Sequence, residues 1–284
     1  MRTYLTVVTT DDYAIGALAL RQSLLNTTPR PRYGFVVVLT KTVSDECERA
    51  IRDAGIQTLR LNKHLRATSH FPTQSGKQGF LHWNNTLSKL LIFDLIQYEK
   101  IVYLDSDMIV LRNLDDLFER PHMSAVVADK LMPGHESWVQ LCSGTIVIEP
   151  KAGLTAAILE HAKDVESRGL VYSDQDVLQE CFADWPMHPE LHLEQTYGVF
   201  VRSLDRYLKV YGYNLNLAAP DDRTIAIVHF VGARKPWTWS IAGRSFRLLM
   251  HLCRGESAAA NILLNYFGLL RWARAALRSS NTRA

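Results

Sequence analysis

KIVYLDSDMIVL, residues 100–111, is the stretch that decides the fold. Its first five residues are mostly apolar, which predicts a short buried strand. Two aspartates, Asp105 and Asp107, follow at the point where that strand ends. Open α/β sheets bind their ligands at the carboxyl ends of their strands. The stretch therefore predicts an α/β fold with an acidic site at one edge of its sheet.

Short runs rich in β-branched and aromatic residues predict further strands on both sides of this stretch. These runs are Tyr4–Thr9, Tyr33–Thr40, Gln57–Leu61, Met108–Leu111, Ser143–Glu149 and Ile225–Val231. Apolar residues at helical spacing predict helices between the strands, one of them beginning at Ser44 and another covering Asn85–Gln97. Near-continuous apolar strands that alternate with helices indicate a mostly parallel sheet covered on both faces. The polar segment Asn62–Trp83 is predicted to be irregular.

The composition is typical of a folded globular protein, with 284 residues, 47% of them hydrophobic, and no low-complexity tract. Neither a transmembrane segment nor a signal peptide is evident, since the first ten residues lead directly into an apolar strand pattern. Four scattered cysteines without metal-binding spacing favour a reducing compartment over a disulfide framework. We therefore expect a cytoplasmic protein.

Basic residues concentrate at the C-terminal end. Residues 234–284 hold nine Lys or Arg and one Glu, whereas the preceding residues carry a net negative charge. The apolar stretch Ala258–Leu270 is too short to span a bilayer, and arginines follow it beside Phe267 and Trp272. Two interpretations stay open: an amphipathic helix that lies on the anionic inner face of a membrane, or a helix that packs on the protein's own core. Nucleic-acid binding is not expected from basic residues gathered in one apolar-rich tail.

Asp105 and Asp107 carry the chemical prediction. Aspartates at positions i and i+2 of a strand end can reach one divalent cation, and such a cation neutralises a diphosphate leaving group. The spacing alone is weak evidence, because Asp174-Gln175-Asp176 repeats it. The place of Asp105-Ser106-Asp107 directly after a predicted strand favours the functional interpretation.

His229 follows another apolar run and precedes Gly232 and Lys235. A histidine in an apolar strand is more often a core residue than a ligand. Here the glycine would let phosphate approach the backbone closely, and the lysine would supply a positive charge to it. An imidazole can also complete an Asp/Asp/His donor set, which suits Mn²⁺, with Mg²⁺ as the other candidate.

Four segments, taken together and in order, resemble one enzyme family. They are TVVTTDDYAIGALAL (6–20), LSKLLIFDLIQYEKIVYLDSDMIVLRNLDDLFE (87–119), SGTIVIEP (143–150) with YSDQDVL (172–178), and HFVGARKPW (229–237). From about Tyr4 to Trp239 the chain is similar to the retaining glycosyltransferases of family 8, the glycogenin-like group with the GT-A fold. The resemblance implies a Rossmann-like, mixed but mostly parallel sheet flanked by helices over residues 1–240, with a helical basic extension over residues 241–284.

The resemblance also implies an activity and a role for each matching residue. The activity is metal-dependent transfer of a hexose, glucose or galactose, from a UDP-sugar to a hydroxyl of a glycan, glycolipid or protein. The nucleotide would contact Thr9, Thr10, Tyr13 and Ser106. The cation would be bound by Asp105, Asp107 and His229. The diphosphate would lie against Gly232 and Lys235. The sugar would be surrounded by Lys89, Asp129, Ser143, Gly144, Asp174 and Gln175, the last two beneath the anomeric carbon.

The chain departs from the family pattern at Cys142, where Asn is frequent, and at Asp176, where Gly is usual. Asp174 has an alternative role as a helix N-cap. Retention at the anomeric carbon leaves two mechanisms open, a double displacement through Asp174 or attack on the face from which the diphosphate departs.

Two other functions compete with glycosyl transfer. A non-catalytic, membrane-associated sugar-nucleotide-binding protein would fit the basic tail. A sugar-phosphate nucleotidyltransferase would need a glycine-rich loop after the first strand, yet no glycine precedes Gly16 there. Deletion of Ser257–Ala284 is expected to weaken vesicle binding and to spare transfer to a soluble acceptor.

Overall fold

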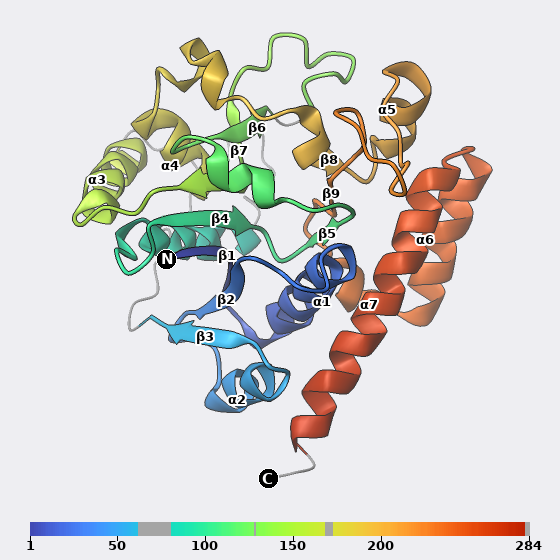
Figure 1. The fold of residues 1–284 in the computed structure, drawn as a ribbon, viewed down its shortest axis with the longest axis horizontal. Coiled ribbons are helices and arrows are strands. Elements are labelled where there is room, and N and C mark those ends of the chain that lie inside the picture. Colours follow the sequence, from blue (N-terminus) through green and yellow to red (C-terminus); the bar gives the residue numbers. More distant parts are fainter. Residues whose placement is uncertain (62–80, 128, 168–172, 282–284) are drawn as a thin grey trace.

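The computed structural model describes residues 1–61, 81–127, 129–167 and 173–281 (Figure 1). In these ranges the main sheet has six strands: β1 (Arg2–Val8), β2 (Gly34–Leu39), β3 (Gln57–Arg60), β4 (Lys100–Leu104), β6 (Ala125–Val127) and β7 (Leu141–Ile148). Their order is β3-β2-β1-β4-β7-β6. The first four strands in that order are parallel, and β7 and β6 are antiparallel to their neighbours. The predicted mixed, mostly parallel sheet is confirmed.

The structure explains why the sequence of β4 is almost continuously apolar. All five of its residues are buried, because both faces of the sheet are covered. Ile101 and Tyr103 join one hydrophobic cluster, whereas Val102 and Leu104 join another on the opposite face. The alternation of side chains along a strand therefore places apolar residues in two separate cores.

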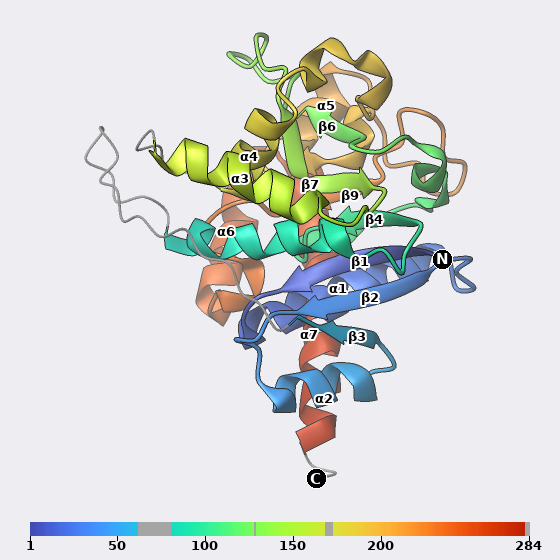
Figure 2. The same ribbon diagram turned by 90° about the vertical axis from the view of Figure 1, so that its left-hand side faces the viewer.

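Helices cover both faces of the main sheet (Figure 2). One face packs against the 3₁₀ helix η1 (Leu81–Asp94), α3 (Leu154–Ser167) and α4 (Asp174–Cys181). α1 (Asp11–Thr27) and α2 (Asp45–Asp53) contribute to the clusters on the other face. Ser44 caps α2 as predicted, since its hydroxyl accepts a hydrogen bond from the Cys47 amide. The helix predicted over Asn85–Gln97 begins and ends earlier, as η1, and the predicted irregular segment Asn62–Trp83 lies outside the described residues except for its last three.

A second, smaller sheet contains β5 (Met108–Val110), β8 (Val199–Phe200) and β9 (Ile227–His229) in the order β5-β9-β8. The apolar runs in the sequence predicted β5 and β9. They did not predict that these strands form a sheet separate from the main one. β8 and β6 were not predicted from the sequence. The antiparallel pairing of β5 with β9 sets Met108 opposite His229.

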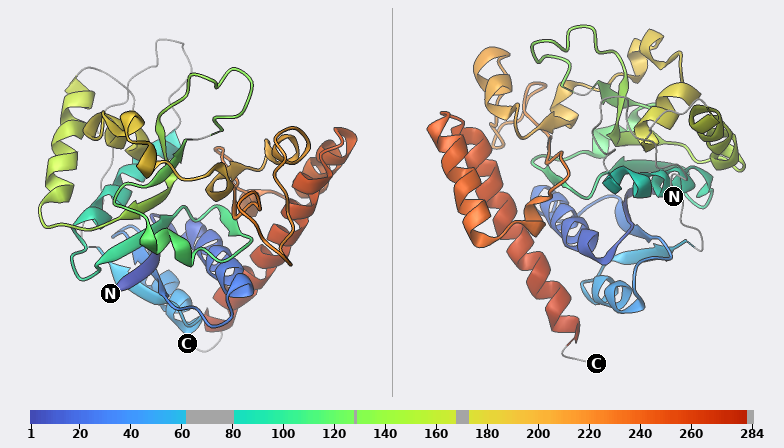
Figure 3. Two further views of the ribbon diagram at one scale, coloured as in Figure 1. Left: turned by 45° about the horizontal axis from the view of Figure 1, so that its top comes forward. Right: turned by 180° about the vertical axis from the view of Figure 1, so that it is seen from behind.

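The helix α5 (Leu204–Val210) precedes β9, and the described chain ends in α6 (Ile241–Cys253) and α7 (Ser257–Asn281). Figure 3 shows α6 and α7 side by side, with α7 running on past α6 toward the C-terminus. α7 buries Ile262, Leu263, Tyr266 and Leu270, and the ring of Tyr266 stacks on Phe230 at 4.1 Å between centroids. The apolar face of α7 thus covers the protein's own core, as the second interpretation of the tail predicted. Among the described residues, every helix is too short or too polar to cross a membrane.

Candidate active site

The turn Asp105–Asp107 joins the two sheets, because it leaves the main sheet at the end of β4 and enters the small sheet at β5. Backbone hydrogen bonds hold both ends of the turn. The Asp105 amide donates to the Gly144 carbonyl on β7 at 2.9 Å, and the Phe230 amide donates to the Asp107 carbonyl at the same distance. The acidic turn is therefore fixed between strands that lie far apart in the sequence.

Asp105, Asp107 and His229 converge at this turn. One ligand atom from each lies within 4.8 Å of the others. His229 Nε2 is 3.1 Å from Asp107 Oδ1 and 3.8 Å from Asp105 Oδ2. The register of β5 with β9 produces this proximity, since it sets His229 opposite the residue that follows Asp107. Two carboxylates and an imidazole at these distances fit a divalent cation.

Two lysines balance the negative charge of this cluster. Lys235 Nζ is 2.5 Å from Asp107 Oδ2, and Lys89 Nζ lies between Asp105 Oδ1 at 3.1 Å and Asp174 Oδ2 at 2.7 Å. Burial by itself would raise the pKa of Asp107, but the charges of His229 and Lys235 hold that pKa below its ordinary value. Burial would likewise lower the pKa of Lys89, and its two carboxylate partners raise it instead. The site thus keeps Asp107 and Lys89 in their charged forms.

A cavity of about 600 Å³ opens over these residues. Its wall includes most of the residues predicted from the sequence, namely Thr9, Tyr13, Lys89, Asp105, Ser106, Asp107, Ser143, Gly144, Asp174, Gln175, His229, Gly232 and Lys235. These residues come from segments throughout the chain. The cavity is large enough for a small-molecule ligand and carries both signs of charge.

Two predicted residues, Thr10 and Asp129, do not line the cavity. Thr10 precedes α1, and its carbonyl accepts a hydrogen bond from the Tyr13 amide. Asp129 is buried, and its Oδ2 accepts hydrogen bonds from Ser203 Oγ at 2.9 Å and from Arg202 at 3.3 Å. Arg202 does line the cavity, so Asp129 reaches the site through this arginine.

The residues around Asp174 form a connected group. Lys89 Nζ donates to the carbonyl and hydroxyl oxygens of Ser143, and Gln175 Oε1 accepts from the Ser143 amide at 3.2 Å. Ser173 occupies the N-cap of α4, which leaves Asp174 as the first helical residue. Asp176 closes a capping box with Ser173. The departure from the family pattern at Asp176 therefore has a structural role.

Sequence reasoning missed several residues of the cavity wall, including Tyr103 and Arg202. The Tyr103 hydroxyl donates to Asp105 Oδ1 at 2.6 Å, and burial raises the pKa of Tyr103, so that it stays a donor. Tyr103 could have been predicted from the sequence, because it lies two residues before Asp105 and therefore on the same face of the strand. Arg202 follows the short strand β8 and had no such signal.

Comparison with known proteins shows that the chain is similar to sugar-transferring enzymes. The sequence model of glycosyl transferase family 8 matches residues 4–240. Human glycogenin-1 is 30% identical over 84% of this chain. The UDP-glucuronate:xylan alpha-glucuronosyltransferase 2 of Arabidopsis thaliana is 29% identical over 82%. The chain spans only part of these relatives, 62% of the first and 35% of the second.

Solved structures share the fold at low sequence identity. A galactosyltransferase, LgtC, in complex with donor and acceptor sugar analogs aligns with a TM-score of 0.56 at 16% identity, over 92% of this chain and 95% of that one. The glycosyltransferase GlyE of Streptococcus pneumoniae aligns with a TM-score of 0.55 at 17% identity, over 98% of this chain and 63% of that one. At these identities the similarity establishes a common fold.

Proposed function

The chain belongs to glycosyl transferase family 8, and from this premise we propose that it is a metal-dependent, retaining glycosyltransferase. It moves a hexose, glucose or galactose, from a UDP-sugar to a hydroxyl of a glycan, glycolipid or protein. The observation that carries the proposal is the convergence of Asp105, Asp107 and His229 in one cavity that also holds Lys89 and Lys235. Acids and bases that face one cavity suit a ligand made of a cation and a diphosphate.

The cation would be held by Asp105, Asp107 and His229, and this donor set suits Mn²⁺ or Mg²⁺. When bound, the cation supplies positive charge that stabilises the departing diphosphate. Lys235, now paired with Asp107, supplies a second positive charge on the same side. Gly232 has a φ of +125°, and a Cβ at this position would have no described atom within 4 Å apart from those of Gly232 and its two chain neighbours. The backbone at Gly232 is therefore open to a phosphate.

The nucleoside would lie against the N-terminal end of α1. Tyr13 and Thr9 line the cavity there, and Ser106 does so from the acidic turn. The Tyr13 ring meets Trp237 edge-on at 5.4 Å between centroids, which holds it in place for stacking on uracil. Thr10 contributes indirectly, because its carbonyl holds the first turn of the helix that carries Tyr13.

The reaction exchanges one bond at the anomeric carbon for another. The acceptor hydroxyl oxygen bonds to that carbon while the carbon–oxygen bond to the diphosphate breaks, and the bonding electrons leave with UDP. The hydroxyl proton passes to the departing diphosphate oxygen. Asp174, the candidate nucleophile of a double displacement, is tied to Lys89 at 2.7 Å. This ion pair lowers the nucleophilicity of Asp174, so we favour attack on the face from which UDP departs.

In this mechanism Asp174 and Gln175 position the sugar through Lys89 and Ser143. Asp129 orients Arg202 toward the sugar hydroxyls. Residues 1–240 hold the proposed site, and residues 241–284 add two helices, of which α7 packs on that unit, and basic residues that favour contact with an anionic membrane surface. No disulfide joins the four cysteines, all of which lie in the described ranges, and this favours a cytoplasmic location at the inner face of such a membrane.

The substitution Asp107→Asn tests the proposal. Loss of one carboxylate charge should lower UDP release from UDP-glucose or UDP-galactose with Mn²⁺ by about 100-fold or more, since cation stabilisation contributes several kcal/mol. The rise in melting temperature on adding Mn²⁺ with UDP should disappear as well. Asp53→Asn, on the exposed side of α2, is the matched control and should behave as wild type.

Wild-type turnover by Asp107→Asn would refute the metal assignment. If the wild-type protein binds UDP with Mn²⁺ but transfers no sugar to any acceptor tried, the non-catalytic sugar-nucleotide-binding alternative replaces the enzyme.

A further inference from the structure

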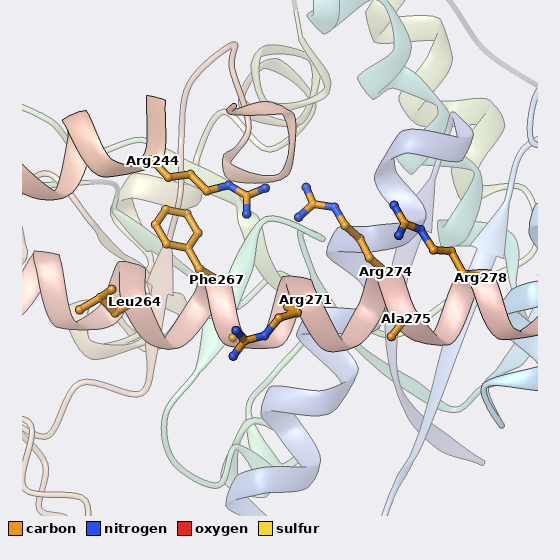
Figure 4. A pocket seen from close by; sticks show the side chains of 8 residues that line it. Arg244, Leu264, Phe267, Arg271, Arg274, Ala275 and Arg278 are labelled. Carbon is orange, nitrogen blue, oxygen red and sulfur yellow. The ribbon is translucent and has the colours of Figure 1, made fainter. Parts of the chain in front are cut away.

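A groove between α6 and α7 is lined by several arginines. It measures about 710 Å³, and its wall includes Arg244 from α6 with Arg271, Arg274 and Arg278 from α7. Figure 4 shows Arg244 and Arg274 reaching toward one another from the two helices. Within the described part of the chain, none of these four guanidinium groups forms an ion pair with a carboxylate.

This charge arrangement is unfavourable without an anion. The Arg244 guanidinium lies over the Phe267 ring at 5.3 Å, and its buried Nε has no hydrogen-bond partner among the described residues. Arg274 donates a hydrogen bond to the Trp237 carbonyl, which fixes it beside the groove. Burial and then the charges of Arg244 and Arg278 lower the pKa of Arg274. A phosphate placed among these groups would remove the repulsion and supply the missing acceptor.

An exposed apolar surface adjoins the groove on α6. No residue of α6 is buried, and Ile241, Phe246, Leu249 and Leu252 are 83%, 61%, 58% and 57% exposed. At 100° per residue these four side chains share one side of the helix, and Arg244 lies on another. An apolar helix side next to unpaired arginines is typical of a helix that lies in a membrane interface.

We propose that α6 and α7 form a lipid-docking surface, in which the phosphate of an anionic phospholipid occupies the arginine groove and the apolar side of α6 enters the acyl region. A free phosphate would satisfy the arginines but would leave the exposed apolar side chains of α6 without a partner. The lipid accounts for both features. This surface is separate from the cavity that holds Asp105 and Asp107, so docking does not depend on the proposed transfer.

Vesicle flotation of the full chain tests the proposal. The protein should float with phosphatidylcholine vesicles that contain phosphatidylglycerol, and much less with phosphatidylcholine alone. The pair Arg271→Gln and Arg278→Gln, both exposed, should weaken binding about 25-fold, at about fivefold for each arginine. The pair Phe246→Ser and Leu249→Ser should weaken it by about tenfold or more. The control pair Arg30→Gln and Lys163→Gln removes the same charge from elements outside the groove and should bind as wild type.

Equal binding by wild type and both groove variants would overturn the proposal, as would equal binding to neutral and anionic vesicles. A thermal-shift arm with inorganic phosphate distinguishes the other source of the ligand. One outcome would show that the groove takes free phosphate and that the lipid assignment is wrong. In that outcome phosphate raises the melting temperature of the wild type, the double substitution Arg271→Gln and Arg278→Gln abolishes this rise, and no variant alters flotation. All variants should keep the wild-type melting temperature and UDP release, which separates a failure of docking from a failure of folding or catalysis.

Discussion

At the scale of single residues, Gly144 connects backbone geometry to the proposed metal ligands. A Cβ at this position would lie 2.8 Å from Met108 Cε and 2.9 Å from His229 Cε1. The methionine end can move away, but the imidazole can move only by leaving Asp107, to which it is bound at 3.1 Å. The absence of a side chain at Gly144 therefore keeps His229 in reach of the two aspartates.

We expect Gly144→Ala to weaken Mn²⁺ binding about tenfold, because the methyl group displaces the His229 ring from the donor set. The measurement is Mn²⁺ titration followed by melting temperature in the presence of UDP. Gly34→Ala, whose Cβ would meet nothing closer than 3.7 Å, is the control. An unchanged Mn²⁺ affinity for Gly144→Ala would show that His229 does not bind the ion.

At the scale of elements, His122 connects the segment before β6 to the end of β7. Its Nδ1 accepts a hydrogen bond from the Glu149 amide at 3.0 Å, and its ring meets Phe93 and Phe182 edge-on. Acceptance at Nδ1 requires an unprotonated nitrogen. Burial lowers the pKa of His122 from 6.5 to about 4, which the Glu149 charge only partly offsets.

This shift predicts a pH dependence of stability. As the pH falls, the unfolded chain binds a proton at His122 near pH 6.5, whereas the folded chain binds it only near pH 4. The contribution of neutral His122 to the free energy of unfolding is therefore fully present above pH 6.5 and is lost as the pH falls to about 4. At most about 3 kcal/mol of unfolding free energy is involved. His122→Asn keeps an acceptor without a titrating group and should flatten the urea-unfolding profile between these pH values. An unchanged slope would contradict the assignment, and exposed His161→Asn serves as the control.

At the scale of the whole molecule, α7 packs into the core that residues 1–240 form. Its residues Tyr266 and Leu270 share a cluster with Tyr207 of α5 and Phe230 beyond β9. α7 also runs along α1 and α2, and its Ala273 belongs to the cluster beneath those helices. The same helix therefore supports both the segment that carries His229 and the helix that carries Tyr13.

We now expect removal of residues 257–284 to abolish folding, rather than to spare transfer as the tail pattern suggested. The deletion would expose the apolar surfaces of two clusters, at several kcal/mol in total. Heat-induced unfolding of residues 1–256, followed by circular dichroism, should lack a cooperative transition, whereas residues 1–281 should unfold as the full chain does. A cooperative transition and normal UDP release by residues 1–256 would refute this expectation.

Local sequence patterns were enough to predict the kinds of elements and the chemical groups of the site. Strand β4 was predictable because all five of its residues are buried on the two faces of one sheet. Asp105, Asp107, His229 and Lys235 could be chosen because carboxylates, imidazole and ammonium after apolar runs suit a cation and a diphosphate. Such inferences need only local pattern and side-chain chemistry.

Only the tertiary structure decided which of these groups meet. The pairing of β5 with β9 brings His229 to Asp107, and the contact of Asp129 with Arg202 withdraws Asp129 from the cavity wall. The burial of one side of α7 was likewise undecided between a membrane and the protein's own core. The physical reason is that strand register and packing depend on free energies of contacts between segments far apart in the chain, which no local period of the sequence records.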